Sequence, residues 1–280
     1  MTITLLGAVE IRNIAAELDL RPAKSLGQNF VIDANTCRKI VRIANLAETD
    51  HVVEIGPGLG SLTLALLEVT NKVTVVEIDS RLAARLSETL KTHGAAEINI
   101  VNQDALQIRE IPGAPTKLVA NLPYNVSVPV LLHFLELFPT IDSGVVMVQY
   151  EVAERLAAKP GSKSYGVPSA KAAWWCDLSL ADDVSRNVFW PVPNVDSALV
   201  TFHRHQPIGD EELRKLTFIL IDEAFGKRRK MLRAALSGIF GSSAKAEELL
   251  LIAGIDPTAR GESLDISQYA QLARAWRETK

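Results

Sequence analysis

The sequence predicts a doubly wound α/β domain with a mostly parallel sheet, followed by a small all-helical C-terminal domain. Short apolar runs rich in Val and Ile alternate with helical patterns up to Glu151, which is typical of parallel strands buried on both faces. From Glu211 to the end the pattern is helical. We therefore place the boundary near 206–210, with domains of residues 1–207 and 208–280.

The elements of the first domain are expected in a regular order. Residues up to about Leu20 predict a short amphipathic helix, which forms an N-terminal arm, and a second helix is expected from about Ala34 to Ala44. Helices are also expected in 61–70 and in 81–94, where Gly94 is a stop signal. The strands are expected within "HVVEIG", "KVTVVEID", "INIVNQDAL", "KLVANLPY", "SGVVMVQYE" and, last, "SALVTFHRH".

Composition limits the class of protein. The 280 residues are 48% hydrophobic and carry a formal net charge of −3, which suits a packed core but no global attraction to nucleic acid. The N-terminal residues lack the features of a signal peptide or membrane span. Cys37 and Cys176 are expected to be reduced thiols of a cytoplasmic protein. His203 and His205 have no third ligand at suitable spacing, so no metal site is expected.

A glycine-rich turn follows the first strand of the predicted sheet. "VVEIGPGLGSLT" places Gly56, Gly58 and Gly60 where the chain passes into a helix, and glycine there lets the backbone approach a ligand. A tight turn without a ligand is the alternative. Glu77 and Asp104 end the next two strands, where carboxylates can accept hydrogen bonds from ribose hydroxyls and an adenine amino group. Together these residues predict an adenosine-containing cofactor.

The spacing and charge of this turn favour one cofactor. The pattern is G-x-G-x-G, whereas dinucleotide folds usually have G-x-G-x-x-G. Glu54 adds an acid two residues before the first glycine, which suits a cation better than a pyrophosphate. S-adenosylmethionine carries an amino group and a sulfonium and has no phosphate. The sequence therefore favours S-adenosylmethionine, with NAD as the alternative.

"NLPY" ends the fourth strand and suggests chemistry on an amino group. The Asn121 side chain and a backbone carbonyl, that of Leu122, are placed to accept the two hydrogens of an adenine N6 and stabilise the charge that develops there. Pro123 would hold this backbone, and Tyr124 offers a face on which a flipped base can stack. The alternative is a turn with a helix cap and a core tyrosine.

These stretches together resemble the ribosomal RNA adenine dimethylases, and within them the KsgA type of bacteria. The resemblance implies a Rossmann-like class I S-adenosylmethionine-dependent methyltransferase. It implies dimethylation of N6 of two adjacent adenosines near the 3′ end of 16S rRNA, and a role in biogenesis of the small subunit. The resemblance is carried by "KSLGQNFVID", "VVEIGPGLGSLT", "VVEID", "NQDAL", "NLPYNVSVP", "MVQYEVAERLAAKPGSKSYG", "VFWPVPNVDSALV" and "AFGKRRKMLR".

The resemblance also implies roles for individual residues. It places Asn29 and Val31 on the cofactor, although the family usually has Leu where this chain has Val31. Phe189 would sandwich the target base against Tyr124, and an ordinary core aromatic is the alternative. The bulky Trp190 beside it departs from the pattern. The remaining cofactor and active-site matches are Gly56, Glu77, Asp104 and Asn121.

A basic segment is the predicted RNA-binding surface. On a helix, Lys227, Arg229, Lys230 and Arg233 would share one face, opposite an apolar face. We expect this face to bind RNA phosphates; a merely solvated face is the alternative. Arg228 falls within the apolar face, so we expect it to be partly buried and paired with a carboxylate.

Other possibilities remain open at this point. If the basic face does not bind RNA, Lys24 and the loop Lys159–Lys171, which we expect to be mobile, are the next candidates. The expected partners are small-subunit ribosomal RNA and the immature subunit, with the protein a monomer. A methyltransferase that acts on 23S rRNA and confers antibiotic resistance is one alternative function. A mainly non-enzymatic assembly factor is another.

Overall fold

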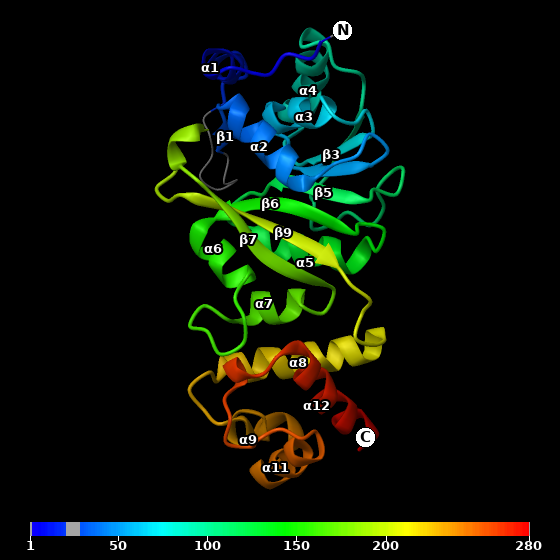
Figure 1. The fold of residues 1–280 in the computed structure, drawn as a ribbon, viewed down its shortest axis with the longest axis vertical. Helices are drawn as coiled ribbons and strands as arrows, with labels where there is room; N and C mark the ends of the chain where they lie inside the picture. Colours follow the sequence, from blue (N-terminus) through cyan, green and yellow to red (C-terminus); the bar gives the residue numbers. More distant parts are fainter. Residues whose placement is uncertain (1, 21–28, 280) are drawn as a thin grey trace. The chain divides into compact units, whose positions relative to one another are not determined.

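The computed structural model describes residues 2–20 and 29–279, which form two compact units (Figure 1). The first unit runs to Ala153 and also includes Ser179–Arg204; the second comprises Glu154–Leu178 and the chain from His205 onward. The predicted boundary near residue 207 lies close to Arg204, where the chain leaves the first unit for the last time. Residues Glu154–Leu178 were expected in the first domain but group with the second unit.

A seven-stranded sheet forms the centre of the first unit, in the order β4-β3-β2-β5-β6-β9-β7. The pairs β2–β3, β3–β4, β2–β5 and β5–β6 are parallel, and β9 is antiparallel to β6. This confirms the doubly wound, mostly parallel prediction. The strands are β2 (Val52–Ile55), β3 (Val73–Glu77), β4 (Asn99–Asn102), β5 (Lys117–Asn121), β6 (Ser143–Gln149), β7 (Cys176–Val184) and β9 (Ser197–Arg204).

Two strand features were not predicted. The edge strand β7 carries mostly exposed side chains, and a polar edge strand lacks the apolar pattern that marks buried ones. A separate two-stranded sheet pairs β1 (Phe30–Val31) with β8 (Phe189–Trp190) in antiparallel register. Each of these strands has only two residues, too few to show any periodicity.

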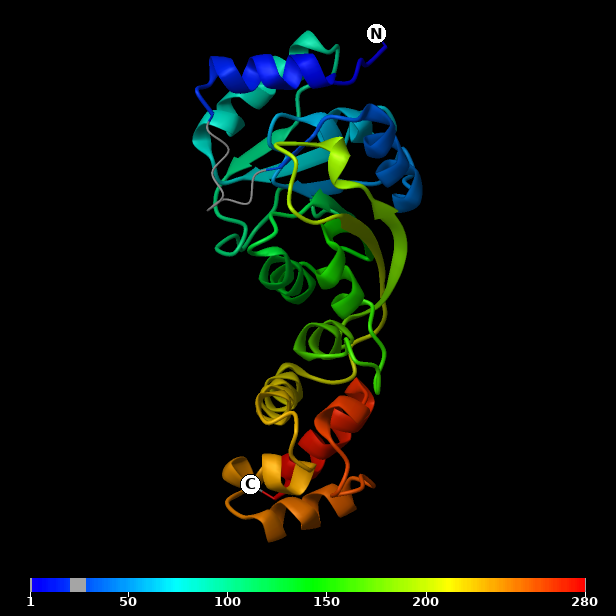
Figure 2. The ribbon, with the colours of Figure 1, turned by 90° about the vertical axis from the view of Figure 1, so that its left-hand side faces the viewer.

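Helices flank the sheet, and α1 to α4 lie where the sequence predicts them, whereas α5 and α6 were not predicted. The helix Ala34–Ala44 begins and ends at the predicted residues, because the Asp33 carboxylate accepts from the Thr36 amide (2.8 Å) and Asn45 is left-handed. The N-terminal helix lies beside α4 (Figure 2) and is tied to it by the ion pair Arg85–Glu17 (2.8 Å). The helices are α1 (Ala8–Glu17), α2 (Ala34–Ala44), α3 (Ser61–Leu67), α4 (Ser80–Thr92), α5 (Ser127–Leu137) and α6 (Tyr150–Leu156).

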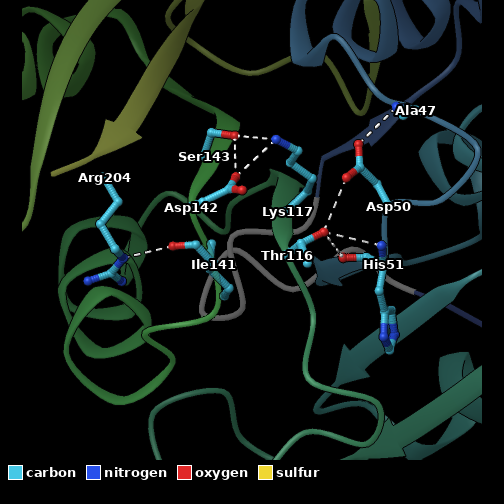
Figure 3. A network of polar contacts seen from close by, with 9 residues as sticks. All are labelled: Ala47, Asp50, His51, Thr116, Lys117, Ile141, Asp142, Ser143 and Arg204. Carbon is cyan, nitrogen blue, oxygen red and sulfur yellow. Dashed lines mark hydrogen bonds and ion pairs between the residues drawn. The ribbon is translucent and has the colours of Figure 1, made fainter.

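A network of polar contacts joins the amino-terminal ends of three neighbouring strands (Figure 3). Just before β2, the His51 amide donates to the Thr116 hydroxyl (3.3 Å), and the Thr116 amide donates to the His51 carbonyl (2.8 Å). At the start of β5, the Lys117 ammonium donates to Asp142 (2.9 Å) and to Ser143 (2.6 Å), where β6 begins. These contacts set the register of the strands, and thereby align their carboxyl ends.

The second unit is helical. Trp174 and Trp175 are buried and meet the Phe218 ring edge to face, at 6.3 and 5.4 Å between centroids. The Tyr165 hydroxyl donates to the Leu264 carbonyl (3.1 Å). The helices are α7 (Val167–Ala172), α8 (Glu211–Gly226), α9 (Leu232–Ala235), α10 (Ser237–Phe240), α11 (Ser243–Ile252) and α12 (Ile266–Glu278).

Two predictions for this unit are wrong in part. Within the supposedly mobile loop Lys159–Lys171, residues from Val167 onward belong to α7 and Tyr165 is buried. The basic segment is not one helix, because α8 ends at Gly226 and α9 begins only at Leu232. The Leu232 amide donates to the carbonyl of Ala259 (2.8 Å). This hydrogen bond joins two residues that are distant in sequence. Helical periodicity reflects only residues that are close together in the chain, so it could not predict this contact.

Contrary to the prediction from the sequence, the basic side chains do not all lie on one solvent-facing helix face. Lys227 pairs with Glu223 and Arg233 pairs with Glu247, whereas Arg229 and Lys230 are exposed and form no ion pair with any described residue. Arg228 is half-buried and pairs with Glu262 (2.6 Å), as predicted. Lys24 lies outside the described residues.

No helix in the described part of the chain is long and apolar enough to cross a membrane. The two cysteines are both buried, and neither forms a disulfide with a described residue. Burial raises the pKa of the Cys37 thiol to about 12, so this side chain is neutral and behaves as a small apolar group.

Candidate active site

A cavity of about 220 Å³ lies at the carboxyl ends of β2, β3 and β5. Ligands bind at this edge in open α/β sheets, because the strand ends and the following loops converge there. The structure brings most of the predicted site residues to its wall. They are Asn29, Val31, Glu54, Gly56, Gly58, Glu77, Asp104, Asn121, Leu122, Pro123 and Tyr124.

Glu77 ends β3 and is 4% exposed. One carboxylate oxygen accepts from the Gly58 amide (3.1 Å) and the other from the Asp79 amide (3.0 Å). These bonds hold the carboxylate between the glycine turn and the start of α4. Burial raises its pKa, and the two amide donors oppose that shift. Each oxygen keeps a lone pair, so the side chain can accept from two ligand hydroxyls.

Glu54 lies within β2 and is 1% exposed. The Thr63 hydroxyl of α3 donates to one of its oxygens (2.6 Å). Burial raises its pKa to about 8, and the nearby Glu77 acts in the same direction. Neither carboxylate forms an ion pair with any residue that the structure describes. Two buried acids without a cation favour a positively charged ligand, whose charge would compensate both.

The three glycines of the turn have different roles. Gly56, Gly58 and Gly60 all have a positive φ, at 67°, 57° and 97°. A Cβ on Gly58 would lie 2.9 Å from the Phe30 ring, so only glycine fits against β1. Gly60 was expected on the cofactor but does not line the cavity, and a Cβ there would lie 2.8 Å from Leu86. Its role is to turn the chain into α3 and to pack against α4.

Asp104 follows β4 and lines the cavity. One of its carboxylate oxygens accepts from the Leu106 amide (2.9 Å), which fixes the side chain after the strand ends. The structure therefore places three carboxylates, Glu54, Glu77 and Asp104, along one wall at the ends of successive strands. Acids contributed by three different strands suit a ligand with several separate donors.

Asn121 is held by a long-range hydrogen bond. Its amide nitrogen donates to the Asn29 carbonyl (3.1 Å), across 92 positions of the sequence. A carbonyl accepts only, so the amide must present its NH₂ to Asn29, and the side-chain oxygen is the atom left for a ligand. No described backbone group donates to the Leu122 carbonyl, which is a second available acceptor.

Tyr124 lies on the cavity wall and is oriented by β9. Its hydroxyl forms a 2.7 Å hydrogen bond with the hydroxyl of the fully buried Ser197. Burial raises the pKa of Tyr124, so it is neutral. Pro123 packs on the glycine turn, since its Cδ would lie 3.7 Å from a Cβ placed on Gly56. The turn and the "NLPY" segment thus form adjoining parts of one wall.

Phe189 is not where the resemblance implies. It is completely buried, belongs to the hydrophobic core and does not line the cavity. Its strand pairs with β1, with Phe189 opposite Val31 in the register. The structure therefore corrects the expectation that Phe189 sandwiches a base and supports the core alternative. The neighbouring Trp190 stacks on Phe30 at 6.4 Å.

Two supporting residues were missed. Thr63 and Ser197 orient Glu54 and Tyr124; both lie in the quoted motifs, but neither was assigned a role. Thr63 lies nine positions after Glu54, on the helix that follows the strand, a spacing at which a strand–turn–helix unit brings side chains together. Ser197 is 73 positions from Tyr124, and no local signal connects them.

Glu54→Gln is expected to stabilise the protein while weakening its hold on a cationic ligand. A carboxyl pKa of about 8 in the folded chain, against 4.5 unfolded, means that folding takes up a proton, so stability falls as pH rises from 4.5 to 8. The neutral amide does not carry this cost, which is on the order of 4 kcal/mol at pH 8 for the stated pKa values. Thermal unfolding at pH 4 and pH 8 should show the gain at pH 8 only. An equal gain in stability at pH 4 and pH 8 would contradict the proposal that the gain comes from removing the Glu54 charge.

Comparison with known proteins identifies close relatives over almost the whole chain. The family model described as ribosomal RNA adenine dimethylase matches residues 20–277. "Ribosomal RNA small subunit methyltransferase A" of Paenarthrobacter aurescens is 54% identical over 274 residues, which are 97% of this chain and 94% of that protein. The protein of the same name from Streptomyces coelicolor is 55% identical, covering 96% of both chains.

Solved structures share the fold. A dimethyladenosine transferase from Plasmodium falciparum superposes with a TM-score of 0.74 at 23% identity, over 88% of this chain and 96% of that one. The 23S rRNA methyltransferase ErmE superposes with a TM-score of 0.67 at 28% identity, over 88% and 99%.

Proposed function

Since the chain belongs to the ribosomal RNA adenine dimethylase family, we propose that it dimethylates N6 of two adjacent adenosines near the 3′ end of 16S rRNA. The substrate is the small ribosomal subunit during its assembly, and the protein acts as a cytoplasmic monomer. The single observation that carries the chemistry is Asn121, whose amide NH₂ is committed to Asn29, so that its oxygen faces an incoming amino group.

The methyl donor of this family is S-adenosylmethionine, and the cavity suits it. When bound, it supplies an electrophilic methyl group. Glu77 would accept the ribose hydroxyls, and Asp104 would accept the adenine amino group. Glu54 would lie beside the positively charged methionine end. The charge arrangement, with acids and no paired cation among the described wall residues, supports this assignment over a phosphate-bearing cofactor such as NAD.

The "NLPY" residues would act on the target adenosine. The Asn121 oxygen and the Leu122 carbonyl would accept the two N6 hydrogens. This increases electron density on nitrogen and stabilises its positive charge as the new bond forms. Tyr124, held by Ser197, would stack on the flipped base. No strong general base is required, since a cationic alkylated amine loses its proton readily to water.

Two alternative functions predict different features of the protein. A large-subunit methyltransferase is supported by the likeness to ErmE, but relatives near 55% identity bear small-subunit names. A non-enzymatic assembly factor would not require Asn121 to be oriented. Primer extension across the two adenosines, in subunits incubated with protein and methyl donor, tests the proposal. Stops at both adenosines are expected, and their absence, or stops in 23S rRNA instead, would refute it.

The proposed partners of the basic segment are RNA phosphates. Lys227 and Arg233 are among the cations of this segment. Of its cations, Arg229 and Lys230 are exposed and unpaired within the described chain, so they can bind without breaking an ion pair. Replacing both by Ala should weaken RNA binding and flatten the dependence of log K on log salt by roughly 0.7–0.9 per lost contact. Cofactor affinity should not change.

Two matched variants give this prediction its controls. Lys245→Ala removes a partly exposed cation paired with Glu248 and should leave the salt slope unchanged. Arg228→Ala breaks the pair with Glu262 and the bond to the Lys163 carbonyl (3.0 Å), so it should lower the melting temperature. An unchanged slope in the Arg229/Lys230 variant would mean that RNA is held elsewhere.

A further inference from the structure

A groove lies on the surface of the first unit, separate from the cofactor cavity. It is formed by the loop after β7 and the segment that precedes β9, together with the first residue of α6. Its lining includes one aromatic ring, two apolar side chains and five polar or charged groups. The principal lining residues are Tyr150, Asp183, Arg186, Asn194, Val195 and Asp196.

Two consecutive residues link this groove to the wall of the target-base site. The Asp196 carbonyl accepts from the Tyr150 amide (3.0 Å), which fixes the start of α6 against the groove. The next residue, Ser197, forms the 2.7 Å bond to the Tyr124 hydroxyl. A base stacked on Tyr124 and a group in the groove would therefore bind on either side of the same two-residue segment.

The chemistry of the groove suits a flat, uncharged group. Tyr150 is 37% exposed and Val195 is 42% exposed, so both offer apolar surface. The Arg186 guanidinium is already engaged by the Asn194 carbonyl (2.8 Å) and by the Asp196 carboxylate (3.2 Å). The Asp183 carboxylate adds a negative charge. With its cation occupied and an acid on its wall, the groove would repel a phosphate but can stack and hydrogen-bond a nucleobase.

We propose that this groove binds the base next to the target adenosine, with Tyr150 as the stacking surface. The inference rests on the proposed function. When one of two adjacent adenosines enters the cavity, its neighbour lies one nucleotide away and has lost a stacking partner. A second aromatic surface beside the first replaces that lost stacking and holds the strand open on both sides of the segment.

The test is a double-mutant cycle between protein and RNA. Small subunits are reconstituted with 16S rRNA that is either intact or abasic at one of the two adenosines, so that one target remains. For the intact RNA, Tyr150→Ala should lower kcat/KM roughly 5- to 100-fold, the loss of one base–aromatic stack. For the abasic RNA, Tyr150→Ala and wild type should be equal. Tyr150→Phe should match wild type on both.

Other variants and measurements make the outcome specific. Leu180→Ala removes a side chain that is 43% exposed on β7 and should change neither rate, whereas Val195→Asp should reproduce the loss on intact RNA. Cofactor affinity and melting temperature should stay at wild-type values. A Tyr150→Ala variant that equals wild type on intact RNA, or loses the same factor on both RNAs, would overturn the inference. Failure of wild type on both RNAs would refute the proposed function itself.

Discussion

Asn121→Ala is expected to slow methyl transfer roughly 10²- to 10³-fold, the usual loss when one preorganised dipole at a developing charge is removed. The bond from its amide to Asn29 aims the side-chain oxygen before substrate arrives, so no reorganisation is needed during the reaction. Alanine removes that acceptor and leaves only the Leu122 carbonyl. Binding of cofactor and RNA depends mainly on other residues, so the effect should fall on the chemical step.

Single-turnover rates at saturating small subunits and S-adenosylmethionine measure this step directly. Asn13→Ala, which removes an exposed asparagine of α1, is the matched control and should keep the wild-type rate. Tyr124→Ala should lose base stacking of about 1–3 kcal/mol and therefore affect substrate binding as well. If the Asn121→Ala rate equals that of wild type, the "NLPY" segment is only a turn.

Glu77→Ala is expected to weaken S-adenosylmethionine binding by two or more orders of magnitude. The carboxylate would accept two ribose hydroxyls, and charge-assisted bonds contribute on the order of 1.5–3 kcal/mol each. The substitution also leaves the Gly58 and Asp79 amides without their acceptor, so the glycine turn itself should loosen. Both effects act in the same direction on affinity.

Calorimetric titration of the folded variant with S-adenosylmethionine is the measurement. Glu77→Gln separates the two effects, because it keeps the side-chain volume and one acceptor oxygen while removing the charge. It should bind with intermediate affinity. Glu97→Ala, an exposed acid, should bind like wild type. Unchanged affinity in folded Glu77→Ala would refute the ribose assignment, and NAD binding by wild type in place of S-adenosylmethionine would refute the cofactor.

Features that depend on local pattern could be predicted from the amino-acid sequence. Buried strands are recognised by their apolar runs, and α2 by the helical pattern over residues 34–44. The acids Glu77 and Asp104 and the segment from Asn121 to Tyr124 could be assigned to one site, because the carboxyl ends of parallel strands meet at one edge. The structure brings all of them to the same cavity.

Features that depend on contacts between distant residues could be seen only in the folded structure. Phe189 looks like a site aromatic in its motif, but pairing of β8 with β1 buries it. The basic segment has a helical pattern, yet the amide of Leu232 bonds to Ala259 and the helix is interrupted. The 2.7 Å bond between Tyr124 and Ser197 spans 73 positions. Burial and long-range hydrogen bonds are set by which segments pack together, and that information lies in no short stretch of the chain.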